Sequence, residues 1–236
     1  MNVLIRPSVA KGKINAPASK SYAHRLLICA ALSEGVSVIE NIGTNDDIKA
    51  TVSCLQQMGV EIIIDGTTAT VKGMNLSAKK DFISLFCNES GSTLRFLIPL
   101  SLIIAEKTEF TGKGRLLLRP QSVYEELFGS KGCYIEKNEK ALVTSGELRN
   151  GAFKVRGDVS SQFLTGLLFA LPLLSGDSEI ILTTELESEP YINITIDIII
   201  SRHCTKTRNM SSKSSSCFFN KRNLFISCKA YSANSI

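Results

Sequence analysis

Apolar residues recur along this chain with two periods, and the periods alternate in a fixed order. Short β-branched segments predict strands, such as those at 36–41, 60–65 and 178–183. Between the predicted strands, helical apolar spacing recurs at 24–35, 46–59, 91–106, 121–132, 160–176 and 190–200. The helix-ending tripeptides Ser-Glu-Gly, Ala-Glu-Lys and Ser-Gly-Asp begin at 33, 105 and 175, so the pattern repeats about every 70 residues.

Each copy of the repeat predicts the order β-α-β-α-β-β. The first strands are expected at 11–17, 82–87 and 152–157. Periodic helices that alternate with β-branched strands predict an α/β fold whose layers pack on one core. We therefore expect repeated β-α-β-α-β-β units that form one nearly complete domain.

The third copy breaks off before its last two strands. By the spacing of the first two copies, a glycine and a strand should follow near residue 202, but residues 201–236 contain no glycine and no alternation. We place the end of coherent fold information at residue 200, give or take two, and expect a disordered basic tail at 201–236. The tail is either a flexible native extension or a foreign, frameshifted C-terminus, and a break inside a repeat favours the second.

Three helix starts carry hydroxyl groups and cations together. The N-terminal end of a helix already has a partial positive charge, so cations there are unfavourable unless an anion binds. One such group would be an ordinary cap, but three at equivalent repeat positions predict a site for a small ligand with more than one anionic group. The groups are Ser19–Ser21 with Arg25, Glu89–Thr93 with Arg95, and Ser160–Gln162 with Arg156.

Two further stretches fit an anion site. Arg119 stands just before Pro120, which fixes the chain ahead of a predicted helix, and an arginine so placed suits capture of a carboxylate or phosphate. Ser188 and Tyr191 begin the last predicted helix. The alternatives to a role in the anion site are that Arg119 is a solvent-exposed loop residue and that Tyr191 is a packing aromatic residue.

Composition narrows the class of protein. The formal net charge is +5, but residues 201–236 hold seven Lys or Arg and no acid, which leaves 20 basic and 22 acidic residues in positions 1–200. A basic tail alone is weak support for nucleic-acid binding, which remains an alternative that rests only on the tail. The seven cysteines show no metal-site spacing and are expected to be small buried side chains. We expect no membrane span, no targeting segment and a cytoplasmic location.

Several stretches of this sequence resemble the 5-enolpyruvylshikimate-3-phosphate synthase family. The matching segments cover residues 3–199 in the family's order: PASKSYAHRLLICAALSEG, NESGSTLRFLIPL, GRLLLRPQSVYEEL, VRGDVSSQFLTGLLFALPL and SEPYINITIDI. The resemblance implies two domains of three repeats each, with 1–14 as a first strand that belongs to the other domain and 15–200 as the substrate-binding domain. A sister enzyme that acts on a UDP-amino sugar shares the fold but lacks the Ser-Lys-Ser signature.

The resemblance also implies an activity and its residues. The family transfers the enolpyruvyl group of phosphoenolpyruvate to the 5-hydroxyl of shikimate 3-phosphate, in the shikimate pathway to chorismate, without metal or organic cofactor. The implied shikimate 3-phosphate contacts are Lys20, Ser21, Arg25, Ser160, Ser161, Gln162, Ser188 and Tyr191. The implied phosphoenolpyruvate contacts are Lys20, Gly91, Ser92, Arg119 and Gln162.

The family's acid/base residues lie in its second domain, which this sequence does not resemble beyond residue 200. We therefore expect a truncated synthase with no catalytic residue of its own and little or no turnover alone. The alternatives are a non-catalytic fragment that still binds shikimate 3-phosphate and a half-enzyme completed by a separate polypeptide. The substrates are the expected partners, and we expect a monomer that binds neither nucleic acid nor membrane.

Overall fold

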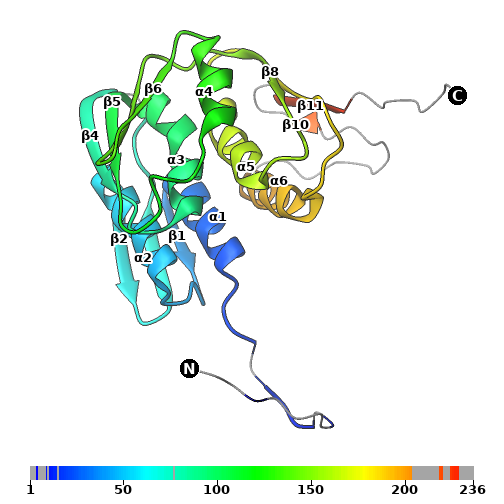
Figure 1. Ribbon diagram of the computed structural model, residues 1–236. Helices are drawn as coiled ribbons and strands as arrows, with labels where there is room; N and C mark the ends of the chain where they lie inside the picture. Colours follow the sequence, from blue (N-terminus) through cyan, green and yellow to red (C-terminus); the bar gives the residue numbers. More distant parts are fainter. Residues whose placement is uncertain are drawn as a thin grey trace, which may run out of the picture.

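The fold is known from a computed structural model, which describes residues 4, 9, 11–14, 16–76, 78–203, 218–219 and 224–228. Three successive units each place a small sheet on the outside and a helix in the centre (Figure 1). This arrangement confirms the predicted α/β fold of repeated units. None of the helices within the described ranges has the length and apolar character that crossing a membrane requires.

From its first helix onward, the first unit follows its predicted order. Its sheet is antiparallel, in the order β1-β3-β2, and helices α1 and α2 lie against it. The elements are α1 (Lys20–Ala31), β1 (Val36–Ile39), α2 (Asp46–Gln57), β2 (Glu61–Asp65) and β3 (Thr68–Lys72).

The first strand expected at 11–17 is absent from the described part of that segment. Residues 11–14, 16 and 17 form no strand, and Ile14 is 93% exposed. The physical reason is the lack of a neighbour, since alternating apolar residues form a strand only beside a hydrogen-bonding partner. Most of the N-terminal strand 1–14 that the resemblance assigns to another domain lies outside the described residues.

The second unit has the complete set of elements. Its sheet order is β4-β5-β7-β6, with β4 parallel to β5 and the other pairs antiparallel. The elements are β4 (Lys80–Phe86), α3 (Gly91–Ile104), β5 (Ala105–Thr111), α4 (Ser122–Gly129), β6 (Tyr134–Lys137) and β7 (Leu142–Ser145).

The third unit begins like the second. Its first two strands, β8 and β9, are parallel, as β4 and β5 are. The elements are β8 (Gly151–Val155), α5 (Ser161–Ala170), the 3₁₀ turn η1 (Leu171–Leu173), β9 (Ser178–Leu182) and α6 (Glu189–His203).

Two short strands lie in the segment that was expected to be a disordered tail. β11 (Leu224–Cys228) pairs with β9, and β10 (Phe218–Phe219) pairs with β11, so they stand where β7 and β6 stand in the second unit. β11 nevertheless runs parallel to β9, whereas β7 runs antiparallel to β5. The expectation of a disordered tail does not describe these two stretches, and residues 204–217, 220–223 and 229–236 of the expected tail lie outside the described residues.

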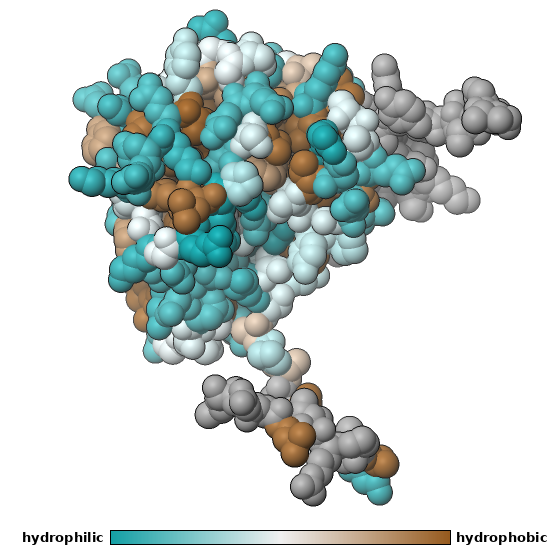
Figure 2. Space-filling model, viewed as in Figure 1, coloured by the Kyte–Doolittle hydropathy of each residue, from teal (hydrophilic) through white to brown (hydrophobic). Residues whose placement is uncertain are grey.

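The core lies between the helices. Eleven of the 14 residues of α3 are buried, which makes α3 the central helix (Figure 1). Gly166 of α5 lets α3 approach closely, because a Cβ at this position would lie 2.6 Å from the carbonyl oxygen of Arg95. On the face shown in Figure 2, hydrophilic residues predominate and apolar ones form small separate patches.

Candidate functional site

A cavity of about 370 Å³ lies where the N-terminal ends of three helices meet. The helices are α1, α3 and α5, the leading helices of the three units, and the start of α6 completes the wall. The lining residues are Lys20, Ser21, His24, Arg25, Ser92, Phe96, Ser160, Ser161, Gln162, Ser188 and Tyr191. The repeat symmetry thus brings equivalent helix starts together, as the sequence predicted.

The three leading helices begin in the same way. Each has a serine N-cap, namely Ser19, Ser90 and Ser160, whose side chain accepts a hydrogen bond from a backbone N–H of the first turn. None of these three helices has an acidic residue in its first turn. The second helix of each unit does have such residues, which are Asp46, Asp47, Glu125 and Glu189. The partial positive charges of the leading helices are therefore left for an anion from outside.

Arg25 is a buried cation in the cavity wall. Its Nε donates to Thr195 Oγ1 at 2.7 Å, and its Nη1 donates to the carbonyl oxygen of Ser21 at 2.9 Å. Its Nη2 donates to Thr165 Oγ1 and to the carbonyl oxygen of Tyr191, both at 3.2 Å. These contacts occupy four of the five N–H donors of a guanidinium and leave one on Nη1.

No carboxylate of the described residues pairs with Arg25, since all four acceptors are neutral. Arg25 is only 3% exposed, and burial lowers its pKa to about 10, well below the usual value of a guanidinium. The ring of Phe96 lies 5.2 Å from the guanidinium and gives partial compensation by a cation–π contact. A buried charge without a counterion is costly, so this side chain is set up to meet an anionic ligand.

Lys20 supplies the second cation and does have a partner. Its Nζ lies 2.7 Å from Asp47 Oδ2, and half of its side chain remains exposed. Burial alone would raise the pKa of Asp47, but hydrogen bonds from Lys20 and Ser90 and the nearby positive charges bring it below the ordinary value. The pair holds Lys20 at the cavity with its other N–H donors available.

Gln162 connects two of the helix starts. Its Nε2 donates to Ser92 Oγ at 2.9 Å, and its Oε1 accepts from Arg95 Nη1 at 2.9 Å. Arg95 Nη2 also donates to the carbonyl oxygen of Pro120 at 3.1 Å, which fixes the loop that carries Arg119. Burial lowers the pKa of Arg95, whose guanidinium lies 4.5 Å from the ring centre of Phe163.

Gly91 and Arg119 lie against each other beside the cavity and are not among its lining residues. A Cβ on Gly91 would collide with Arg119 Nη1, so the arginine packs on the bare backbone of the helix start. The other contacts that the resemblance implies all line the cavity, namely Lys20, Ser21, Arg25, Ser92, Ser160, Ser161, Gln162, Ser188 and Tyr191. The two predicted sets thus form one continuous region.

Four residues of this region are not among those that the sequence predicts. His24 and Phe96 line the cavity, and the hydroxyl groups of Thr165 and Thr195 hold Arg25. The position of His24, three residues after Ser21 on the same helix, was a usable signal. Thr165 and Thr195 gave none, since they lie in apolar helices far along the chain.

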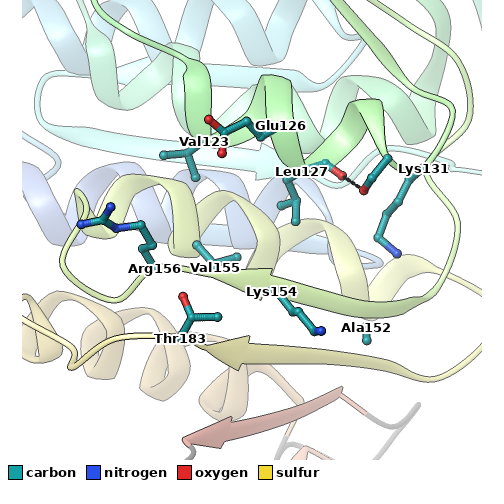
Figure 3. Close-up of a pocket in the computed structure, with 10 residues that line it drawn as sticks. Val123, Glu126, Leu127, Lys131, Ala152, Lys154, Val155, Arg156 and Thr183 are labelled. Atoms are coloured by element: carbon teal, nitrogen blue, oxygen red, sulfur yellow. Dashed lines mark hydrogen bonds between the residues drawn. The ribbon is translucent and has the colours of Figure 1, made fainter.

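Arg156 does not belong to the site, although the sequence places it near the third helix start. It lines a separate groove of about 330 Å³ between α4 and β8, together with Lys131 and Lys154 (Figure 3). Asp158 neutralises Arg156 through contacts from Nε and Nη2. None of the leading helix N-termini lines this groove, so it lacks the features that mark the cavity as an anion site.

The cysteine prediction is confirmed where the structure describes the side chains. Cys29, Cys54, Cys87 and Cys133 are free and buried. The side chains of the other three cysteines lie outside the described residues.

Comparison with known proteins gives a match over most of the chain. The family model of EPSP synthase (3-phosphoshikimate 1-carboxyvinyltransferase) matches residues 6–204. A 3-phosphoshikimate 1-carboxyvinyltransferase of Clostridium kluyveri is 50% identical over 200 residues, which are 84% of this chain and 46% of the relative. One from Clostridium perfringens is 48% identical over 200 residues, 84% of this chain and 47% of the relative. The chain spans about half the length of the curated relatives it matches.

Solved structures agree with the fold. The EPSP synthase of Acinetobacter baumannii matches 86% of this chain and 46% of its own, with a TM-score of 0.65 and 20% identity. The enolpyruvyl transferase NikO of Streptomyces tendae matches 78% of this chain and 42% of its own, with a TM-score of 0.50 and 13% identity. With the family model matched from residue 6 to residue 204, the chain belongs to the EPSP synthase family of enolpyruvyl transferases.

Proposed function

We propose that the cavity binds shikimate 3-phosphate and forms half of the site of a 3-phosphoshikimate 1-carboxyvinyltransferase. The observation that carries the proposal is Arg25, a buried cation without a carboxylate partner among the described residues, in the wall of a cavity made by three acid-free helix N-termini. A ligand with a carboxylate and a phosphate would meet both cations, Arg25 and Lys20. The hydroxyl groups around the cavity would donate to the remaining anionic oxygens.

The proposed contacts divide into two sets that overlap at Lys20 and Gln162. Shikimate 3-phosphate would contact the cavity lining, and phosphoenolpyruvate would bind beside it. The first set is Lys20, Ser21, Arg25, Ser160, Ser161, Gln162, Ser188 and Tyr191, and the second is Lys20, Gly91, Ser92, Arg119 and Gln162. The region between them is continuous through the Gln162–Ser92 hydrogen bond.

Turnover would need groups beyond this cavity. Its lining contains no Asp or Glu to transfer a proton to or from the substrates, and residues 201–236 contain none either. The fixed cations and N–H groups would stabilise charge that develops on phosphate and carboxylate oxygens during transfer. We therefore propose that residues 1–236 alone bind the ligand without significant turnover, and that a second domain supplies the proton-transfer groups.

Binding is tested by titrating the 236-residue chain with shikimate 3-phosphate by calorimetry and by NMR. We expect saturable binding, with backbone shifts at Ser21 and Ser160. Lys20→Gln should raise Kd at least about tenfold because a charged hydrogen bond is lost. The matched control is Lys49→Gln, since Lys49 is an exposed lysine that pairs with Asp46 at 3.6 Å and does not line the cavity.

Two results would overturn the binding proposal. One is the absence of shifts at these residues with ligand in the millimolar range. The other is an equal effect of Lys20→Gln and Lys49→Gln. Tighter binding of a UDP-amino sugar than of shikimate 3-phosphate would assign the chain to the sister activity instead.

The need for a second domain is tested by mixing. The chain is refolded with the C-terminal half of the Clostridium kluyveri relative, and phosphate release from both substrates is followed. We expect turnover in the mixture and not in either half. Turnover by the chain alone would show that the proton-transfer groups lie within these 236 residues.

A further inference from the structure

His24 is the one cavity residue with a buried titratable side chain that the proposed contacts do not use. It is 1% exposed, and its ring stands edge-on to Phe96 with the ring centres 6.1 Å apart. Nδ1 lies 2.7 Å from Thr51 Oγ1, whereas Nε2 is buried without a hydrogen-bond partner among the described residues.

The contact with Thr51 is the start of a line of short hydrogen bonds. Thr51 Oγ1 lies 2.7 Å from Thr93 Oγ1, which lies 2.7 Å from Ser90 Oγ. Thr51 Oγ1 and Thr93 Oγ1 also lie 3.3 Å and 3.5 Å from the carbonyl oxygen of Asp47. The line leads from α1 through α2 to the N-cap of α3, and Asp47 carries it back to α1 through its contact with Lys20.

The contact between Thr93 and Ser90 fixes the direction of the other protons in the line. Thr93 Oγ1 donates its single proton to Ser90 Oγ, so in its contact with Thr51 it can only accept. Thr51 must use its single proton toward Thr93 at 2.7 Å, since the alternative acceptor, the carbonyl oxygen of Asp47, is 3.3 Å away. Whether Thr51 donates to Thr93 or to the carbonyl oxygen of Asp47, it has no proton left to donate to His24. Nδ1 must therefore carry the imidazole proton, and Nε2 is left as a bare lone pair.

The charges around His24 agree with this neutral form. The groups that face it are Lys20 and Arg25 on α1 and Asp47 on α2. Burial disfavours the imidazolium most, the two cations add to this effect, and Asp47 opposes them. A second proton on Nε2 would stand unpaired near Arg25.

We propose that His24 is a positioning residue of the cavity, whose Nδ1–H begins a hydrogen-bonded line that orients the Ser90 cap of α3 and the first turn of α2, where Asp47 holds Lys20. The proposal deepens the proposed function and rests on it for the identity of the ligand. The line itself is a property of the ligand-free protein. Two of the three leading helix starts are thus set relative to each other by one buried imidazole.

The first test observes the tautomer directly. Two-bond ¹H–¹⁵N correlation spectra of the 236-residue chain should show His24 protonated at Nδ1 and unprotonated at Nε2. Thr51→Val removes the acceptor and keeps the shape, so the proton should move to Nε2 in this variant. Thr144→Val is the matched control, because Thr144 Oγ1 makes an equally buried 2.8 Å hydroxyl contact with Ser101 away from the cavity. An Nε2–H tautomer in the wild-type chain would overturn the proposal.

The second test separates positioning from packing. His24→Asn keeps a donor close to the place of Nδ1–H, whereas His24→Leu fills the space without one. The pKa of the Asp47 carboxyl, followed by ¹³C NMR, should rise in His24→Leu and stay low in His24→Asn. Kd for shikimate 3-phosphate should rise about tenfold in the leucine variant and stay within about threefold in the asparagine variant.

The outcomes of the second test distinguish the two proposals. Equal Asp47 pKa values in both variants would overturn the role of His24, whatever the ligand does. The Asp47 pKa can follow the expected pattern in the two variants while the wild-type chain fails to bind shikimate 3-phosphate. This result would overturn the proposed function alone. If His24→Leu does not fold, Thr51→Val replaces it, and the same rise in the Asp47 pKa is expected.

Discussion

The Nε of Arg25 and the hydroxyl oxygen of Thr195 lie 2.7 Å apart, although 170 residues of chain separate them. The contact joins the first helix to the last, and both residues are buried. The hydroxyl group of Thr195 donates a hydrogen bond to the carbonyl oxygen of Tyr191 at 2.9 Å. The buried cation of the site is therefore fixed only when the first and third units are packed together, which ties the cavity to the completed fold.

Thr195→Val is expected to destabilise the chain by about 1–3 kcal/mol, because it leaves a buried N–H donor of Arg25 without an acceptor. Urea unfolding measures the change. Thr111→Val is a suitable control, since Thr111 is a half-buried threonine of β5 whose side chain makes no hydrogen bond within the described part of the chain. The control should stay within about 0.5 kcal/mol of the wild type. Equal losses in both variants would contradict the role given to Thr195.

Stability should fall as the pH is lowered through the window set by His24. Burial, the largest cause, together with Lys20 and Arg25, lowers the pKa of His24 from 6.5 to about 4, while Asp47 opposes the shift. Between these values the unfolded chain binds a proton that the folded chain excludes, so unfolding becomes easier as the pH falls. Below about pH 4 the imidazole takes up a proton in both states and adds no further change.

The difference between the two pKa values corresponds to about 3 kcal/mol. Urea unfolding at about pH 7.5 and about pH 4.5 should show this loss in the wild-type chain and not in His24→Asn, which cannot titrate. Equal losses of stability in the wild type and in His24→Asn would mean that groups other than His24 cause the destabilisation at acid pH.

The sequence predicted the architecture well because the signals for it are local. All six helices and most strands lie at the predicted positions, since helical and alternating apolar spacing is visible within a few residues. The convergence of Lys20, Ser92 and Gln162 followed from repeat symmetry. Their separation along the chain is large, yet the repeat puts them at equivalent positions.

Contacts between different units were not predictable in the same way. Nothing in the local sequence indicates that Thr165 and Thr195 hold Arg25, since 140 and 170 residues separate them from it. The strand expected at 11–17 is absent from the described residues for a related reason, because a strand depends on a partner that local spacing does not reveal. Long-range pairing decided each of these cases.

Gly91→Ala should weaken binding of phosphoenolpyruvate while leaving the fold intact. The added methyl group would collide only with the guanidinium end of Arg119, a flexible side chain that can move aside. Alanine is also a better helix former than glycine, so stability should stay equal or rise by up to about 1 kcal/mol. Competition binding in the reconstituted mixture measures affinity for phosphoenolpyruvate. Unchanged affinity would show that Arg119 does not act from the position it has here.

Gly166→Ala should be among the most damaging single-methyl changes in the chain. Gly166 faces α3, and a Cβ would press on the carbonyl oxygen of Arg95, the Oη of Tyr124 and, at 3.1 Å, the Cγ of Pro99. The Oη of Tyr124 cannot yield freely, because it lies 2.9 Å from the Arg95 carbonyl oxygen and 2.8 Å from that of Phe163. Overpacking of this kind costs about 1–3 kcal/mol or more.

The matched control for this change is Gly129→Ala at the end of α4. A Cβ at Gly129 meets nothing within 4 Å, so the same substitution should be neutral or stabilising by up to about 1 kcal/mol. Thermal unfolding of the two variants side by side should therefore shift Tm in opposite directions or leave only Gly129→Ala unchanged. A Gly166→Ala protein as stable as the wild type would mean that α3 and α5 can separate at little cost. The cavity between their N-terminal ends would then be far less rigid than the binding proposal requires.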